Sequence, residues 1–144
     1  MSTEATLRRL ADRAELEDLV ARHSVWVDEG RWDETDRIFT GDVVITSPRG
    51  GELRGIDAVV EHVRRSQGTF ARTLHNKANL VIDLDGDTAD VRAHDIGVFA
   101  IDDTTAQVAA GIARYRAVRT PAGWRFAGLA LEAVALTAAI DRAL

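Results

Sequence analysis

The fold of this chain is decided by one stretch, His23-Ser24-Val25-Trp26-Val27-Asp28-Glu29-Gly30-Arg31-Trp32-Asp33. It ends a predicted helix over residues 3–28, because apolar side chains recur on one helical face up to Val27. Gly30 is suited to the left-handed conformation that follows many helices. Asp28 stands in the last turn, where the helix dipole disfavours an anion, and this cost suggests a purpose. An isolated Asp at a helix end is nevertheless more often simply solvated.

The residues on either side of this stretch predict smaller elements. Asp12 is expected to be a local break or cap within the helix, with Glu15 as its capping partner. Asp33 is expected to cap a short helix over residues 33–39. Gly41-Asp42 predicts a turn before a hairpin, whose strands cover residues 43–46 and 52–55 on either side of Ser47-Pro48-Arg49-Gly50-Gly51. A helix over residues 56–67 follows, and Gly68 ends it.

From Arg72 onward the hydrophobic period changes from helical spacing to two. This alternation predicts four long strands, over residues 72–84, 88–101, 105–119 and 123–136. Short turns of Asp, Gly, Pro and Thr separate them, which is typical of an antiparallel meander. The Ala-rich last eight residues are expected to form a helical tail. The chain is therefore predicted to be one α+β domain, residues 1–144, with helices on a curved antiparallel sheet around an apolar pocket.

Composition restricts the possible functions. The chain has 144 residues and a formal net charge of −5, so it lacks the basic face that nucleic acid binding requires. It contains no cysteine, which excludes disulfides and thiolate metal sites. No apolar run approaches the roughly 20 residues of a membrane helix. The first residues lack the pattern of a signal peptide, so a cytoplasmic location is expected.

Two residues are the leading catalytic candidates, Asp28 and His75. His75 lies in Thr73-Leu74-His75-Asn76, at the start of the first long strand. A lone strand histidine usually serves packing, but a histidine paired with a carboxylate is the commonest acid–base group near neutral pH. We therefore expect Asp28 to orient the imidazole of His75 and to favour its charged form.

Four further residues are candidates for substrate contact, namely His23, Asn79, Asp95 and Trp32. His23 lies on the apolar stripe, where a core histidine is equally expected, and it points about 140° away from Asp28 on a regular helix. Asn79 shares strand parity with His75, and Asp95 is expected to face inward while His94 faces out. Four aromatic residues are expected to pack between helices and sheet or at the cavity rim, namely Trp32, Phe39, Trp124 and Phe126.

Other kinds of site are not indicated. No two of the histidines are three or four residues apart, so no metal site is expected. The sequence contains no nucleophile elbow, phosphate-binding loop or dinucleotide fingerprint, so no cofactor is expected. Glu132 interrupts an apolar strand, and an outward position at an edge or interface is expected for it.

The pattern as a whole resembles the SnoaL-like group of the nuclear transport factor 2-like superfamily, which includes scytalone dehydratase, bile-acid 7α-dehydratase and ketosteroid isomerase. The residues that carry the resemblance extend over nearly the whole chain: Asp28-x-x-x-Trp32-Asp33, Ile38-Phe39-x-x-Asp42-Val43, Gly55-Ile56-Asp57-Ala58-Val59, Thr73-Leu74-His75-Asn76, Asp85-Gly86-Asp87-x-Ala89, Arg114-Tyr115 and Gly123-Trp124-Arg125.

This resemblance implies a cone-shaped fold with a deep apolar pocket, and an acid–base pair at Asp28 and His75. The chain departs from the dehydratases at His23, where they often carry Tyr. It also departs near Gly97, where the bile-acid enzyme has an Asp, although Asp95 lies two residues earlier. The resemblance therefore implies roles for Asp28 and His75, but it does not identify the substrate-binding residues.

The resulting hypothesis is a cofactor-free dehydratase or isomerase for a small hydrophobic, cyclic hydroxy or carbonyl compound. The alternatives are a polyketide cyclase or an epoxide hydrolase on the same scaffold, or a non-catalytic module that binds small molecules or serves as an oxygenase subunit. A homo-oligomer, most simply a dimer, is predicted through the outer sheet face, because few helices are available to cover it.

Overall fold

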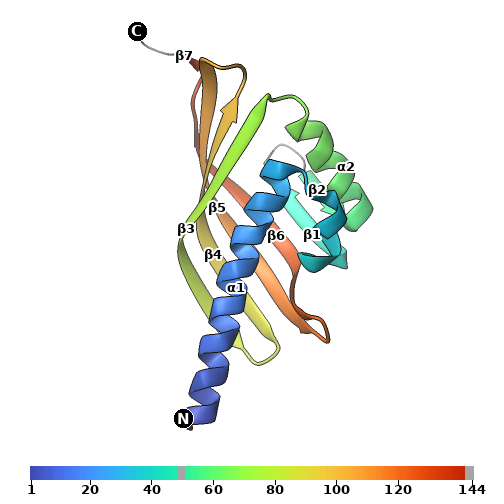
Figure 1. Cartoon of the computed structure of the whole chain (residues 1–144), viewed down its shortest axis with the longest axis vertical. Coiled ribbons are helices and arrows are strands. Elements are labelled where there is room, and N and C mark those ends of the chain that lie inside the picture. Colours follow the sequence, from blue (N-terminus) through green and yellow to red (C-terminus); the bar gives the residue numbers. More distant parts are fainter. Residues whose placement is uncertain (49–50, 142–144) are drawn as a thin grey trace.

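Helix α1 (Thr3–Glu29) crosses one face of a curved sheet in the computed structural model, which describes residues 1–48 and 51–141 (Figure 1). Its N-terminal end is capped by Ser2, whose Oγ accepts a hydrogen bond from the backbone of Ala5 at 3.1 Å. At its C-terminal end Gly30 adopts the left-handed conformation, with φ of 63°, as predicted. The helix continues through Asp12, so the prediction of a break or cap at that residue was wrong.

The segment after α1 differs from the sequence prediction in two places. A 3-10 helix, η1 (Trp32–Arg37), replaces the expected helix 33–39, and it has no side-chain cap from Asp33. Gly41 and Asp42 lie within strand β1 (Phe39–Ser47) and form no turn. The pairing register of β1 shifts between Phe39 and Val44, so these residues introduce an irregularity into a strand that continues.

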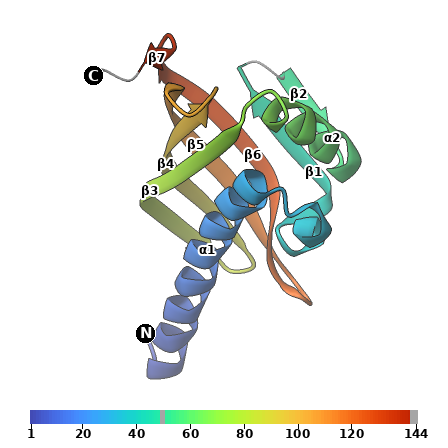
Figure 2. The same ribbon diagram turned by 45° about the horizontal axis from the view of Figure 1, so that its top comes forward.

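Strand β1 pairs with β2 (Gly51–Arg54) as the predicted hairpin, and α2 (Ile56–Gln67) follows with its predicted bounds. Arg49 and Gly50 of the predicted break lie outside the described residues. Helix α2 directs Val59 into the core and ends at Gly68. Both helices lie on the same side of the sheet (Figures 1 and 2).

The predicted meander is confirmed. It consists of β3 (Arg72–Asp85), β4 (Thr88–Ala100), β5 (Thr105–Thr120) and β6 (Gly123–Leu136). The strand order is β2-β1-β6-β5-β4-β3, so β1 joins the sheet by pairing in parallel with β6. The result is the predicted α+β cone, with helices packed on a curved and largely antiparallel sheet.

The predicted helical tail was wrong for the part that is described. Ile140–Asp141 form a short strand, β7, which pairs with Thr105 and Ala106 of β5. These two residues of β5 lie beyond its pairing with β6, so β7 extends the sheet at this end.

The core lies between α1, α2 and the sheet, and it contains the aromatic residues predicted for it. Phe39, Trp124 and Phe126 are buried, and Trp26 and Tyr115 join them. Phe39→Ala is therefore expected to lower the free energy of unfolding by about 3–5 kcal/mol, because it leaves a cavity among packed rings. Denaturant melts measure this loss, and a change well under about 1 kcal/mol would contradict the assigned packing.

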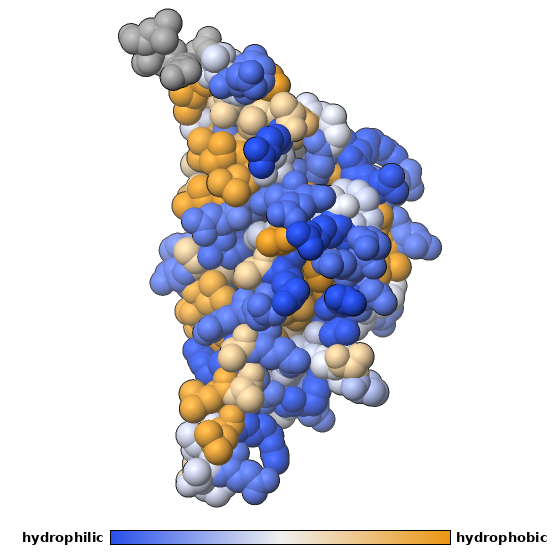
Figure 3. All heavy atoms as spheres, in the orientation of Figure 1, coloured by the Kyte–Doolittle hydropathy of each residue, from blue (hydrophilic) through white to orange (hydrophobic). Residues whose placement is uncertain are grey.

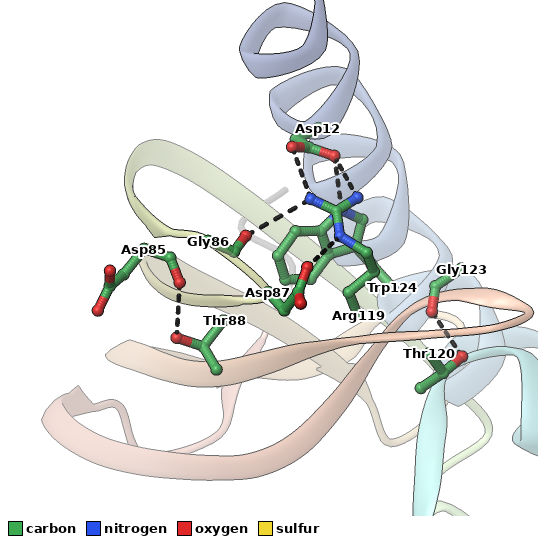
Figure 4. Close-up of polar contacts among 9 residues, drawn as sticks. All are labelled: Asp12, Asp85, Gly86, Asp87, Thr88, Arg119, Thr120, Gly123 and Trp124. Atoms are coloured by element: carbon green, nitrogen blue, oxygen red, sulfur yellow. Dashed lines mark hydrogen bonds and ion pairs between the residues drawn. The ribbon is translucent and has the colours of Figure 1, made fainter. Parts of the chain in front are cut away.

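Asp12 has a different role from the one predicted, because it anchors α1 to the sheet (Figure 4). Its carboxylate accepts two hydrogen bonds from Arg119, at 2.8 and 2.9 Å, and one from the indole of Trp124 at 3.1 Å. The guanidinium of Arg119 also lies 4.6 Å from the Trp124 ring centre and 2.9 Å from Asp87. The group joins the first half of α1 to two hairpin turns of the sheet.

This anchor predicts an acid-dependent stability. The hydrogen bonds from Arg119 outweigh the effect of burial and hold the pKa of Asp12 below its ordinary value of 3.8. A carboxyl group whose pKa is lower in the folded state stabilises the fold above the unfolded pKa, and this stability is lost as pH falls through the folded pKa. Asp12→Asn should cost about 1.5–3 kcal/mol at pH 7. It should also flatten the decline in stability below about pH 4, whereas an unchanged acid decline in thermal melts would contradict the anchor.

Candidate active site

Asp28 and His75 are in direct contact in the structure. Asp28 Oδ1 lies 2.6 Å from His75 Nδ1, and Asp28 Oδ2 accepts the backbone N–H of His75 at 2.7 Å. Thr73 donates its hydroxyl to Asp28 Oδ1 at 2.9 Å. The end of α1 and the start of β3 therefore meet at one carboxylate, which receives three donors.

The electrostatics of Asp28 follow from these donors. Burial raises the pKa of its carboxyl group, but hydrogen bonds from the His75 side chain and backbone, and from Thr73, outweigh burial and leave the pKa below its ordinary value. Asp28 is thus an anion at neutral pH, although the helix end is a poor place for one. The three hydrogen bonds offset the unfavourable helix dipole at Asp28, and the sequence alone did not reveal them.

This arrangement fixes the roles of the two imidazole nitrogens. Since an ionised carboxylate can only accept hydrogen bonds, Nδ1 of His75 must carry a proton and donate it to Asp28. Nε2 is then the basic nitrogen of the neutral ring. Within residues 1–48 and 51–141 no group forms a hydrogen bond with Nε2, so this nitrogen is not engaged by that part of the protein.

The wall beside His75 is shaped by a glycine and an aromatic ring. Gly97 is directly opposite His75 on β4, and the Phe99 ring meets the imidazole edge to face at 5.4 Å. A Cβ atom at Gly97 would lie 2.7 Å from Phe99 and 3.4 Å from the imidazole. Gly97 therefore leaves the space in which these two rings pack.

His23 lies in the aromatic core, apart from the Asp28 carboxylate. Its Nδ1 is 2.8 Å from the Tyr115 hydroxyl, and the rings of Trp26, Phe39 and Phe126 surround it. Burial lowers the pKa of His23 well below its ordinary value, and the nearby charges of Lys77 and His75 act in the same direction. The position favours a neutral core histidine over the substrate contact suggested by the sequence.

The prediction that Asn79 shares a wall with His75 was wrong. Asn79 has a φ of 55°, and the pairing of β3 with β4 shifts register between Ala78 and Val81. This bulge changes the alternation, so Asn79 is exposed, with its amide 3.5 Å from Nε2 of the outward-facing His94. Asp95, in contrast, faces inward and His94 outward, as parity predicted.

Trp32 is not brought together with the pair. It packs edge to face on Trp26 at 4.9 Å and lines a pocket of about 550 Å³ between η1 and α2, with Ile56 and Val60. Neither Asp28 nor His75 lines that pocket. Glu132 points outward, where it pairs with Arg114 at 2.7 Å, as expected for a residue on the outer face.

The sequence analysis missed one interior residue, Lys77. Its side chain is only 4% exposed, and its ammonium lies 3.0 Å from Asp95 Oδ1 and 3.2 Å from Ser24 Oγ. Two signals in the sequence could have identified it. Lys77 is the only lysine in the chain, and it stands two residues after His75, so it shares that residue's face of the strand.

The described residues contain neither a candidate metal site nor a membrane-spanning helix. Among residues 1–48 and 51–141, no three His, Cys, Asp or Glu side chains form a group that could hold a metal ion. No helix in this part of the chain is long and apolar enough to cross a membrane.

Comparison with known proteins identifies relatives of both sequence and structure. An uncharacterized protein of Mycobacterium tuberculosis is 30% identical over 123 residues, which cover 83% of this chain and 84% of that protein. A putative scytalone dehydratase from Novosphingobium aromaticivorans superposes with a TM-score of 0.83 at 19% identity, covering 96% of this chain and 93% of the other. A type 2 hexachlorocyclohexane dehydrochlorinase, LinA, gives a TM-score of 0.85 at 20% identity, covering 96% and 97%.

The structural similarities establish a common fold, since identity in these pairs is low. The family is established by sequence, because a model of the SnoaL-like domain matches residues 8–130. The cone of helices and sheet described above agrees with both comparisons. The chain therefore belongs to the SnoaL-like domain family.

Proposed function

We propose that this protein is a cofactor-free acid–base enzyme, a dehydratase or isomerase, for a small hydrophobic and cyclic hydroxy or carbonyl compound. The observation that supports it most is the contact of 2.6 Å between Asp28 Oδ1 and His75 Nδ1, which leaves Nε2 as a free base. Two structural relatives, the putative scytalone dehydratase and the hexachlorocyclohexane dehydrochlorinase, are named for elimination reactions.

In the proposed mechanism, His75 Nε2 removes a proton from a carbon atom of the substrate. The ring is then an imidazolium, and the anion of Asp28 stabilises its charge through the Nδ1–H bond. In a dehydration, the same Nε2–H gives the proton to the departing hydroxyl group, which leaves as water. In an isomerisation, it returns the proton to another carbon atom. Either reaction restores the neutral histidine.

The alternatives from the sequence predict other products. A polyketide cyclase would form a new carbon–carbon bond, and an epoxide hydrolase would add water. A binding module or an oxygenase subunit would leave the compound unchanged. The pair of Asp28 and His75 favours proton transfer over simple binding, because a carboxylate-oriented base serves no purpose in holding an apolar ligand.

Mass spectrometry of cyclic β-hydroxy ketones incubated with the purified protein tests this proposal. The reaction contains no added cofactor and includes a metal chelator. We expect loss of water from at least one compound with the parent protein, and none above background with His75→Gln. Equal loss of water with both proteins would contradict the role of His75, and addition of water would favour the hydrolase alternative.

We also propose that the protein forms a homodimer through the outer face of the sheet. Several large apolar side chains are exposed on β3 and β4, including Leu74, Val81, Ile96 and Val98. Figure 3 shows hydrophobic residues on the side of the molecule formed by the sheet. Light scattering at micromolar concentration should give twice the chain mass of 15.7 kDa, and a monomeric mass would contradict the proposal.

A further inference from the structure

Lys77 is an unusual residue in this protein, because every other basic side chain apart from the histidines is arginine. Several arginines form ion pairs that are largely exposed, such as Arg22 with Asp18 and Arg116 with Asp90. The ammonium of Lys77, in contrast, is inside the cone, and its ion pair with Asp95 is shielded from solvent. A buried ion pair is often no more stabilising than an apolar pair of similar volume. Stability alone therefore does not explain Lys77.

The sheet register places Lys77 beside the proposed base. His75 and Lys77 are two residues apart on β3 and face the same side. Each begins a row of residues that are paired directly across β3, β4 and β5. The first row is His75, Gly97 and Ala109, and the second is Lys77, Asp95 and Gly111. Residues paired in this way share a face, so the base and the ammonium lie on adjacent rows of one wall.

The remainder of these two rows consists of small residues. The rings of Phe99 and His75 pack over Gly97, the backbone of Glu132 lies against Gly111, and Ala109 is partly exposed to solvent. In Figures 1 and 2 this part of the sheet extends past the C-terminal end of α1 toward β7. A flat molecule that lies over Ala109 would therefore have His75 and Lys77 along one edge.

The ammonium of Lys77 also has an unused donor. A lysine side chain has three N–H groups. The ammonium donates a hydrogen bond to Ser24 Oγ at 3.2 Å and forms an ion pair with Asp95 Oδ1 at 3.0 Å, which lacks hydrogen-bond geometry. Among the described residues, 1–48 and 51–141, it has no other partner. Ser24 on α1 and Asp95 on β4 thus hold the ammonium, and N–H groups remain for a ligand.

We infer that Lys77 binds the carbonyl oxygen of the substrate and stabilises the enolate that forms when His75 removes a proton. This inference rests on the proposed function and defines the substrate class as an enolisable carbonyl compound with a leaving group on the β-carbon. Asp95 and Ser24 are positioning residues, because they act through Lys77.

The electron and proton movements balance without any further reagent. His75 Nε2 takes the proton from the α-carbon, and the electron pair of that C–H bond moves to the carbonyl oxygen, which Lys77 holds as an enolate. When the carbonyl bond re-forms, a double bond forms between the α- and β-carbons, and the bond from the β-carbon to its hydroxyl oxygen breaks. The departing hydroxyl takes the proton from His75 and leaves as water.

Because Lys77 is the only lysine, ¹⁵N-lysine labelling gives a single side-chain amine signal in NMR spectra of the whole chain. The probe is 4-nitrophenol, whose ionised form is a planar aromatic oxyanion that resembles an enolate and absorbs visible light. We expect the Lys77 signal to move with a saturable dependence on the probe. We also expect the bound probe to ionise at lower pH than the free probe, because an ammonium favours the phenolate.

Lys77→Met alone would leave Asp95 buried without its cation, so the test uses the double variant Lys77→Met/Asp95→Asn. A matched control neutralises an ion pair on the outer face, Arg114→Met/Glu132→Gln. The interior double variant should bind the phenolate at least tenfold more weakly, and the outer control should bind it as the parent does. Equal binding by the two double variants, or an unmoved Lys77 signal in the parent, would overturn the inference.

The inference and the proposed function fail in different ways. Asp28→Asn removes a neighbouring anion, so it should preserve or strengthen phenolate binding while it lowers catalysis. If the probe binds as expected but His75→Gln keeps full activity, the proposed function fails and the anion site stands. If His75→Gln is inactive but the probe ignores Lys77, the inference about Lys77 fails alone.

Discussion

His75→Gln is expected to lower kcat by about 10²–10⁴-fold, because it removes the group that accepts and returns the proton. Glutamine keeps an amide donor that can reach Asp28, and the backbone N–H of residue 75 still donates to Asp28 Oδ2. The fold should therefore survive, and thermal melts check this. Steady-state kinetics should show a lower kcat with little change in substrate affinity, since proton transfer acts on the transition state.

His94→Gln is the matched control for this variant. His94 lies on the neighbouring strand but is exposed on the opposite face of the sheet. Its replacement should leave kcat within about twofold of the parent, as is usual for a surface substitution. An active His75→Gln protein, or an equal loss in the His94 variant, would contradict the assignment of the base.

Asp28→Asn is expected to lower kcat by a similar factor, because it changes the hydrogen bonds between residue 28 and His75. The backbone N–H of His75 is a fixed donor to one side of residue 28, so the Asn carbonyl oxygen must face it. The Asn amide nitrogen then faces Nδ1 of His75 and donates to it. The imidazole must place its proton on Nε2, and the base is lost.

Kinetics and nitrogen NMR together test this prediction. We expect kcat to fall by about 10²–10⁴-fold in Asp28→Asn, and ¹⁵N-histidine spectra should show the proton of His75 moved from Nδ1 to Nε2. Asp18→Asn is the control, because Asp18 is an exposed carboxylate on the same helix and pairs only with a surface arginine among the contacts of the described residues. Unchanged activity with an altered tautomer would show that Asp28 has no part in catalysis.

Local signals in the sequence predicted most of the fold. The period of two and the turn residues at Asp85-Gly86-Asp87 and Pro121-Ala122-Gly123 gave the meander, since short turns require neighbouring strands to be antiparallel. The parallel pairing of β1 with β6 could not be predicted in this way, because its partners are far apart in the sequence and no local turn sets their register.

The direction of the candidate site residues could be predicted where the strand alternates regularly, and the prediction failed where a bulge changes the alternation. Asp95 faces inward as alternation requires, but the bulge after Ala78 turned Asn79 outward. Asp12 was interpreted from its neighbours in the helix, whereas its partners Arg119 and Trp124 are more than 100 residues away. Alternation places Lys77 on the same face as His75, but its burial depends on Asp95 of β4 and Ser24 of α1, which are distant in the sequence.

The central claim is that His75 moves a proton on a carbon atom next to a carbonyl group. Exchange of that proton for deuterium in D₂O, followed by proton NMR on a panel of cyclic ketones without any cofactor, tests it most directly. Exchange reports proton abstraction whether the full reaction is a dehydration or an isomerisation. The parent protein should accelerate exchange at the α-carbon of at least one ketone, and His75→Gln should show only the uncatalysed rate. Equal acceleration by the parent and by His75→Gln would contradict the claim.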